Sequence, residues 1–235
     1  MVPFICSIIV IGDSQGYINP FEDVVNYIIE NEQPSSTIIH AGDIFDELIN
    51  NDTEQIEQIN KLRNYFASSI IVRGNHDPID IFEENFDTLP FIQDMCENAT
   101  IIAIDSNRYK VRQLNYIKEQ IDRRPDRIYV VVLHHHLQAC STGDIGPTFW
   151  KAALENTLRS NDLIIHGHSH TENSYHLNNG TLVLSTSSAN IKRYQCLNNT
   201  DCTCDNSSNL SYLKIELTES GWNYNRVTIQ NSDTH

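Results

Sequence analysis

The 235-residue sequence predicts a single α/β domain, and three observations support this prediction. Short apolar runs, typical of buried strands, alternate with segments of helical periodicity through most of the chain. No internal repeat or linker rich in Pro, Gly and Ser divides the chain, so we expect the domain to span residues 1–235. Polar clusters follow the apolar runs directly, as functional groups do at the carboxyl ends of parallel strands.

The predicted elements follow one another in a regular order. Strands are predicted at residues 4–11, 37–39, 70–72, 101–104, 128–133, 163–165, 181–186, 212–217 and 223–229. The first helix is expected to begin at Asn19, whose side chain can cap a segment with Pro20 at its first position. Apolar spacing predicts further helices over 53–66, around 114–121 and over 148–159. Strands dominate the end of the chain, so they are expected to complete the sheet.

Composition and charge limit the partners and the location that we expect. Acidic residues outnumber basic ones by 31 to 16, and the net charge of −15 predicts that the chain binds neither nucleic acid nor an anionic membrane. No apolar stretch reaches the length of about 20 residues that a membrane span requires. The N-terminal apolar run lacks a basic region and a cleavage site, so it predicts a strand and a cytoplasmic protein.

The cysteines are expected to be reduced thiols, because their spacing does not resemble a disulfide framework. They are Cys6, Cys96, Cys140, Cys196, Cys202 and Cys204. For the segment from Cys196 to Cys204, a loop of free thiols is favoured over a structural zinc site, which would lack its fourth cysteine.

One set of polar side chains shares a position directly after predicted strands. The set consists of Asp13, Asp43, Asn75, His76, His135, His168 and His170. Carboxylates, an amide oxygen and imidazoles form a mixed ligand set that suits Mn, Fe, Zn or Co. The set is large enough for two divalent ions, and Asp43 is the natural bridge because a carboxylate can bind two cations.

Five motifs in this order resemble those of calcineurin-like metallophosphoesterases. They are Gly12-Asp13-x-x-Gly16, Gly42-Asp43-x-x-Asp46, Gly74-Asn75-His76-Asp77, His134-His135 and Gly167-His168-Ser169-His170. The resemblance covers residues 4 to about 190. Within the superfamily the chain is most similar to class III cyclic-nucleotide phosphodiesterases and glycerophosphodiesterases, on the segments 104–106, 133–136 and 185–188.

The resemblance implies a four-layer αββα sandwich of two mixed β-sheets, the metallophosphoesterase fold. It places Asp13, Gln15, Asp43 and His170 around a first metal ion, and Asp43, Asn75, His135 and His168 around a second. It also implies that Asn75 and His76 bind the substrate phosphate, that His76 protonates the leaving oxygen, and that Asp77 orients His76.

Two departures from the family pattern bear on these roles. Gln15 stands where the family usually has His, and an amide is a weaker ligand than imidazole for such metals. Leu137 replaces a Pro that usually follows the histidine run. The family pattern makes His135 the ligand, but His134 remains an alternative.

The resulting hypothesis is a dinuclear metal-dependent phosphoesterase. In this reaction a hydroxide that bridges the two ions attacks the phosphorus of a phosphate ester. A small phosphodiester such as a cyclic nucleotide is the favoured substrate. The alternatives are a phosphomonoesterase, a nucleotide pyrophosphatase or a protein phosphatase, and a catalytically weak binding scaffold is a further one because of Gln15. Substrate choice is expected to depend on loops 138–148 and 187–210.

Overall fold

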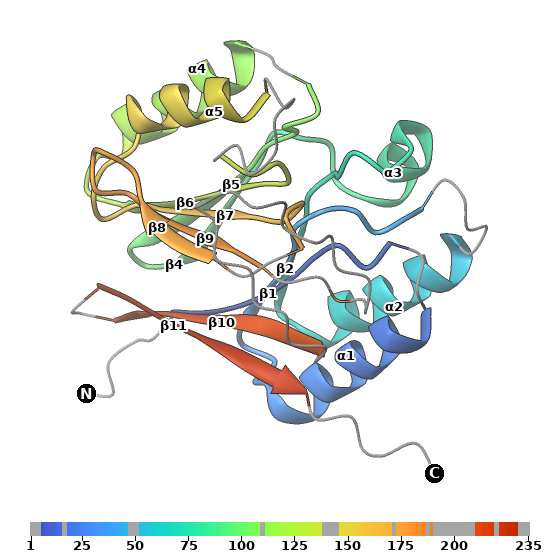
Figure 1. Ribbon diagram of the computed structural model, residues 1–235. Helices are drawn as coiled ribbons and strands as arrows, with labels where there is room; N and C mark the ends of the chain where they lie inside the picture. The colour runs from blue at the N-terminus through green and yellow to red at the C-terminus, as the bar shows by residue number, and fades with distance from the viewer. Residues whose placement is uncertain are drawn as a thin grey trace, which may run out of the picture.

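The computed structural model describes residues 6–15, 18–46, 52–108, 111–137, 146–170, 173–186, 189, 210–218 and 221–229. Two β-sheets pack face to face in this part of the chain, and helices cover their outer faces (Figure 1). The predicted four-layer sandwich is therefore confirmed, whereas the domain boundary at 1–235 stays a prediction. In the part of the chain that the structure describes, no helix has both the length and the hydropathy of a membrane span.

Several predictions fall outside the described residues. They concern Gly16, Ser187, Ser188, Cys140, Cys196, Cys202, Cys204 and most of the two loops expected to select the substrate.

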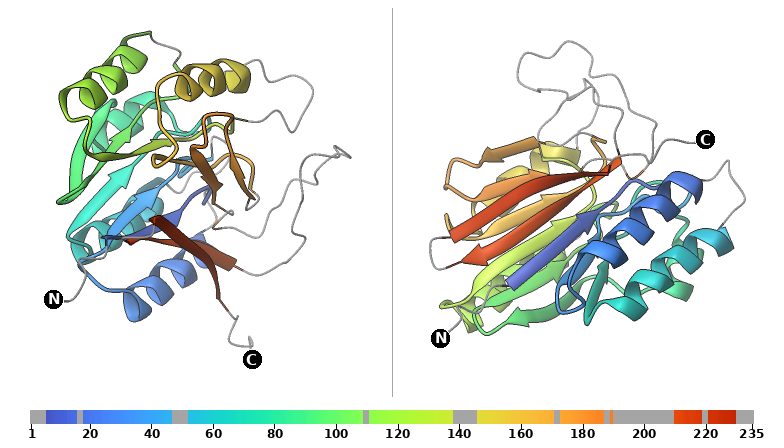
Figure 2. Two further views of the ribbon diagram at one scale, coloured as in Figure 1. Left: turned by 90° about the vertical axis from the view of Figure 1, so that its left-hand side faces the viewer. Right: turned by 90° about the horizontal axis from the view of Figure 1, so that it is seen from below.

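The first sheet has the strand order β11-β10-β1-β2-β3. Its strands are β1 (Cys6–Ile11), β2 (Thr37–His40), β3 (Ser68–Ile71), β10 (Leu210–Thr218) and β11 (Gly221–Ile229). β1, β2 and β3 are parallel, and β10 joins β1 in the antiparallel sense. The helices α1 (Ile18–Asn31) and α2 (Asp52–Tyr65) lie side by side along one face of the molecule (Figure 2).

The second sheet has the order β4-β5-β6-β7-β9-β8. Its strands are β4 (Phe91–Cys96), β5 (Ala99–Ala103), β6 (Ile128–Leu133), β7 (Leu163–His166), β8 (Asn173–His176) and β9 (Leu182–Ser185). The four inner strands are parallel, and both edge strands are antiparallel to their neighbours. The helices α4 (Val111–Arg123) and α5 (Gly146–Glu155) lie above it in Figure 1.

Successive side chains of a strand point to opposite faces of the sheet, and in the inner strands both faces are buried. This explains why these strands appear in the sequence as continuous apolar runs. In β1, Ile8 and Val10 are buried between the sheets with residues such as Val130, while Ile9 and Ile11 are buried against the helices with residues such as Phe21. A strand with apolar cover on both faces has no reason to alternate with polar residues. The inner strands of both sheets are thus buried on both faces, and the parallel strands end at one rim.

Three elements escaped sequence prediction, each for a local reason. β4 and β8 are edge strands whose residues are partly exposed, so polar residues interrupt their apolar pattern. The seven-residue helix α3 (Ile79–Asn85) is too short to show a clear apolar face. The late strands also do not complete a single sheet, because β10 pairs with β1 and β11 in the first sheet, while β9 pairs with β7 and β8 in the second.

A disulfide bond joins Cys6 to Cys96, so the prediction of reduced thiols was wrong for these two residues. Cys6 begins β1 in the first sheet, and Cys96 ends β4 in the second sheet. The two residues are 90 positions apart in sequence, and the packing of the sheets brings their Cα atoms within 6.2 Å. Sequence spacing alone carries no sign of such an approach.

Candidate metal centre

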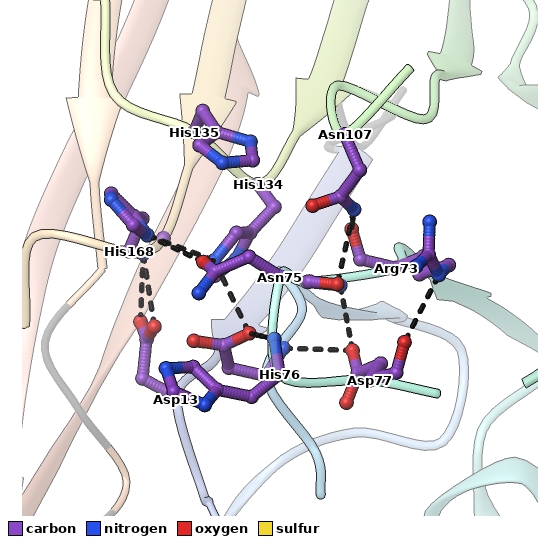
Figure 3. A network of polar contacts seen from close by, with 12 residues as sticks. Asp13, Arg73, Asn75, His76, Asp77, Asn107, His134, His135 and His168 are labelled. Atoms are coloured by element: carbon purple, nitrogen blue, oxygen red, sulfur yellow. Dashed lines mark hydrogen bonds and ion pairs between the residues drawn. The ribbon is translucent and has the colours of Figure 1, made fainter. Parts of the chain in front are cut away.

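The loops after five parallel strands meet at one rim of the sandwich. β1, β2 and β3 of the first sheet lead into Asp13, Asp43 and Asn75, while β6 and β7 of the second sheet lead into the histidines. Figure 3 shows Asp13, Asn75, His134 and His168 close to one another there. The expectation that distant motifs converge at the carboxyl ends of strands agrees with this arrangement.

Two groups of side chains at this rim could hold metal ions, and they share one carboxylate. One group is Asp43, His134 and His168, and the other is Asp13, Asp43 and His170. Within each group the ligand atoms lie within 4.8 Å of one another. Asp43 belongs to both groups, which is the position predicted for a bridging ligand.

Asn75 adds an oxygen atom to the first of these groups. Its Oδ1 atom lies 2.9 Å from His134 Nε2 and 2.8 Å from His168 Nδ1. An amide oxygen and two imidazole nitrogens therefore converge beside the Asp43 carboxylate. The Asn75 side chain is exposed, so a substrate can also reach it.

His134, the alternative ligand, lies in this group, whereas the predicted ligand His135 does not. The His134 side chain is fully buried, and its Nδ1 atom lies 2.8 Å from the carbonyl oxygen of Ala41. This contact directs Nε2 at the other ligands, as metal-binding histidines are commonly oriented. His135 Nδ1 instead lies 2.9 Å from Ser106 Oγ. The geometry favours His134, and a role for His135 in metal binding stays a prediction.

Gln15 lies beside Asp43, but its nitrogen faces the carboxylate. Its Nε2 atom donates to Asp43 Oδ2 over 3.1 Å. An amide nitrogen does not bind a metal ion, so Gln15 in this orientation holds Asp43 in place.

Asp77 connects the two loops that carry Asp43 and Asn75. Its buried carboxylate accepts hydrogen bonds from the backbone N–H groups of Asp43 (3.0 Å), Ile44 (2.8 Å), Phe45 (2.9 Å) and Gly74 (2.6 Å). Four donors on one carboxylate fix both loops relative to each other. The hydrogen bonds show that Asp77 holds the two loops together. Orientation of His76 by Asp77 remains a prediction.

His76 lies at the edge of the site. Its backbone N–H donates to Asp43 Oδ1 over 2.9 Å, and its side chain is only half-buried. The imidazole is therefore partly accessible, and its contact with a substrate stays a prediction.

The backbone at the site adopts an unusual conformation. Among the residues that the structure describes, five non-glycine residues have positive φ angles: Asp13 (53°), Gln15 (40°), Asp43 (57°), His168 (67°) and His170 (52°). Positive φ is uncommon outside glycine and costs of order 1–3 kcal/mol per residue. All five belong to the predicted ligand set, so the strain is concentrated where the side chains must converge.

Gly42 and Gly74 allow this close approach. Gly42 has a φ of 93°, and a Cβ atom there would lie 2.6 Å from His134 Nδ1. A Cβ atom on Gly74 would overlap the backbone and the carboxylate of Asp43. Glycine is thus required where the loops after β2, β3 and β6 touch.

The charges of Asp43 and His134 stabilise each other. Burial alone would raise the pKa of Asp43, but the positive charge of His134 and its hydrogen bond hold that pKa below its usual range. Burial would lower the pKa of His134, but Asp43 raises it to about 9. Burial raises the pKa of Asp13 to about 6, and it does the same for Asp77.

Metal affinity at the group that contains His134 is expected to rise with pH up to about 9. His134 must lose a proton before it can bind a metal, and its pKa is raised to about 9. Below that pH, each further decrease of one pH unit should weaken Mn²⁺ binding about tenfold, because removing the proton from His134 then costs a further 1.36 kcal/mol. Calorimetry at pH 7 in two buffers of different ionisation enthalpy should detect about one released proton. The His134→Asn variant should release none, and equal values for both proteins would contradict the prediction.

Sequence reasoning missed three residues around the site. The Ser106 hydroxyl accepts hydrogen bonds from the N–H groups of His134 (3.2 Å) and His135 (3.1 Å). Asn107 and Arg73 contact the loop that carries Asn75. Ser106 lies in a segment that resembles the family. Asn107 carries no local signal because the two carbonyl groups that it contacts in this loop are 33 and 34 residues away.

Comparison with solved structures shows the same fold at low sequence identity. GAP50, the anchor in the inner membrane complex of Plasmodium, gives a TM-score of 0.67 at 14% identity, over 97% of this chain and 86% of that one. A dimetal phosphatase from Danio rerio gives 0.65 at 11% identity, over 97% and 100%. The structure of PhoD gives 0.62 at 9% identity, over 99% and 72%.

At such low identity the solved structures show only the fold, whereas a sequence model of a family shows membership. No curated protein matches the sequence. The model for calcineurin-like phosphoesterases matches residues 6–172, which include every motif at the metal centre. The chain therefore belongs to the calcineurin-like phosphoesterase family.

Proposed function

We propose that this protein is a dinuclear metal-dependent phosphoesterase that hydrolyses a small phosphodiester such as a cyclic nucleotide. The observation that carries the proposal is the pair of ligand groups that share Asp43, with the accessible side chains of Asn75 and His76 beside them. Membership of a family of phosphoesterases supports the same class of reaction.

The donor set fits two divalent metal ions. Asp13, Asp43 and His170 would hold one ion, and Asp43, Asn75, His134 and His168 would hold the other. Buried carboxylates paired with imidazoles suit Mn, Fe, Zn or Co, and no thiolate takes part among the described residues. Divalent ions in such a site lower the pKa of a bound water and offset charge on a phosphoryl oxygen.

The protein's own residues would bind and orient the ester. The Asn75 amide can donate a hydrogen bond to a phosphoryl oxygen through its nitrogen, since its Oδ1 atom faces the two histidines. The His76 imidazole would give a proton to the leaving oxygen. Asp77 would keep both loops in place during the reaction through its four backbone hydrogen bonds.

Charge supports a diester as the substrate. A phosphodiester carries one negative charge, whereas a monoester carries nearly two at neutral pH. The chain has a net charge of −15, and Arg73, next to the Gly74-Asn75 motif, is paired with Asp105. A dianion would therefore meet more repulsion than a diester.

Two alternatives remain distinct from this proposal. A phosphomonoesterase, a nucleotide pyrophosphatase or a protein phosphatase would use the same ligand groups on a different substrate. A binding scaffold is suggested by Gln15 at a position where the family usually has His, and by GAP50, an anchor with the same fold.

Turnover of bis(p-nitrophenyl) phosphate and p-nitrophenyl phosphate, measured with Mn²⁺, tests these alternatives. We expect kcat/KM for the diester to exceed that for the monoester by at least about tenfold, a difference of 1.4 kcal/mol in transition-state stabilisation. The reverse preference would favour a phosphomonoesterase. Turnover of neither ester at full metal occupancy would favour the scaffold, and the Gln15→His variant would then show whether Gln15 is the cause.

The expected location and partners stay predictions. A cytoplasmic location was expected from the N-terminal sequence, yet disulfides such as Cys6–Cys96 usually form in oxidising compartments. The predicted absence of nucleic-acid and membrane partners still depends on the net charge of −15.

A further inference from the structure

One side chain outside the ligand set contacts the loop between β3 and α3, which carries Asn75 and His76. Asn107 follows β5 in the second sheet, and its Nδ2 atom lies 3.0 Å from the carbonyl oxygen of Arg73 and 3.0 Å from that of Gly74. Figure 3 shows Asn107 and Arg73 on one side of Asn75, and His134, His135 and His168 on the other. Asn107 therefore contacts the backbone of this loop and none of the candidate ligand side chains.

The Gly74 carbonyl belongs to the peptide group that contains the backbone nitrogen of Asn75. Its oxygen accepts from Asn107, while the backbone N–H of Gly74 donates to Asp77 over 2.6 Å. Gly74 is thus held at both its N–H and its carbonyl. Because a peptide group is planar, fixing the carbonyl also fixes the direction in which the chain enters Asn75.

The position of Asn75 must be accurate for its side chain to join the ligand group. Its Oδ1 atom meets His134 Nε2 and His168 Nδ1 at 2.9 and 2.8 Å. Metal and phosphoryl recognition tolerates errors of only about 0.5 Å in such groups. A small rotation of the Gly74–Asn75 peptide would move the amide oxygen out of this arrangement.

Asn107 is itself held rigidly by its surroundings. Asp105 Oδ1 accepts from the backbone N–H and from the Nδ2 atom of Asn107, and Arg73 pairs with Asp105 over 3.3 Å. Gln113, a buried residue of α4, accepts from the Asp105 N–H and donates to the carbonyl oxygens of Asp105 and Arg108. Gln113 of α4 therefore holds Asp105 in place, and Asp105 holds the Asn107 side chain against the Gly74 carbonyl.

We propose that Asn107 is a positioning residue that sets the Gly74–Asn75 peptide, and thereby Asn75, for metal and phosphate binding. The inference rests on the proposed function of the site. Asn107 acts only through the backbone of the loop. Its loss should therefore weaken metal and phosphate binding by Asn75 without removing any ligand. Residues that orient metal ligands typically contribute 10- to 100-fold to metal affinity or activity.

The Asn107→Ala variant tests the proposal. We expect kcat for the diester to fall 10- to 100-fold while KM changes by less than about threefold, because the effect acts on orientation. The matched control is Asn156→Ala, directly after the end of α5. That exposed side chain also donates from Nδ2 to a backbone carbonyl, Ala152, over 2.8 Å, and its loss should leave kcat unchanged. Activity of Asn107→Ala within twofold of the wild type would overturn the proposal.

A double-mutant cycle with Asn75→Ala separates positioning from general loss of stability. If Asn107 acts through Asn75, Asn107→Ala should cause little further loss in the Asn75→Ala background. If both losses multiply in full, Asn107 does not act through Asn75. Should Asn107→Ala fail to fold, Asn107→Asp has the same size and lacks the two N–H donors, so it should show the same loss.

Metal binding keeps the test independent of turnover. If the wild type hydrolyses neither ester, the proposed function fails, but Mn²⁺ titration followed by electron paramagnetic resonance can still be read. Asn107→Ala should then weaken binding of one of two Mn²⁺ ions 10- to 100-fold, and unchanged affinity for both ions would overturn the positioning role.

Discussion

The Asp43→Asn variant is expected to lose both metal ions and at least about 10⁴-fold in kcat/KM, the upper end of what a general acid supplies. Asp43 belongs to both ligand groups, so one substitution weakens two sites. Its Oδ1 atom also accepts from the His76 N–H, and its Oδ2 atom accepts from Gln15. An amide in its place keeps the size, but it removes the charge that attracts both cations.

Metal content measured by mass spectrometry, together with kcat/KM for the diester, tests this result. Asp94→Asn is the matched control, since Asp94 is an exposed carboxylate of β4 that pairs with Arg124 and Arg127. The control should keep two metal ions per chain. Retention of both ions by Asp43→Asn would show that Asp43 is not the shared ligand.

Removal of the His76 imidazole should slow the reaction about 10²- to 10⁴-fold and leave the metal content unchanged. The side chain lies outside both ligand groups, and the backbone N–H that contacts Asp43 remains in His76→Ala. A proton donor matters most when the leaving oxygen is a poor leaving group. The loss should therefore be larger for an alkyl diester than for a p-nitrophenyl diester.

The comparison of the two leaving groups identifies the role of His76. Equal losses for both esters would mean that His76 binds the phosphate and does not protonate the leaving oxygen. His176→Ala is the control, because His176 is an exposed residue of β8 and should not affect either ester.

The sequence predicts the strands that carry the site because apolar side chains cover these strands on both faces. β1, β2, β6 and β7 are buried along nearly their whole length, so each reads as an uninterrupted apolar run that ends where the polar motif begins. Parallel strands of one sheet end at a common edge, so the convergence of Asp13 and Asp43 follows from this pattern. His168 follows a strand of the second sheet, and the packing of the two sheets brings it to the same rim.

Contacts between distant loops explain what the sequence does not predict. The choice between His134 and His135 depends on the Ala41 carbonyl, which is 93 residues from His134. The role of Asp77 depends on backbone groups more than 30 residues away, and that of Asn107 on carbonyls 33 and 34 residues away. No local pattern records which backbone group a side chain will meet after folding.

The Cys6–Cys96 disulfide also bears on the spacing of the two sheets. Cys6 lies at the amino end of β1, and Asp13 lies past its carboxyl end, so the covalent link and the metal centre occupy opposite ends of the strands. The ligand groups draw on loops of both sheets, as the disulfide draws on a strand of each. Bound cations would thus fix the separation of the sheets at one end while the sulfur–sulfur bond fixes it at the other.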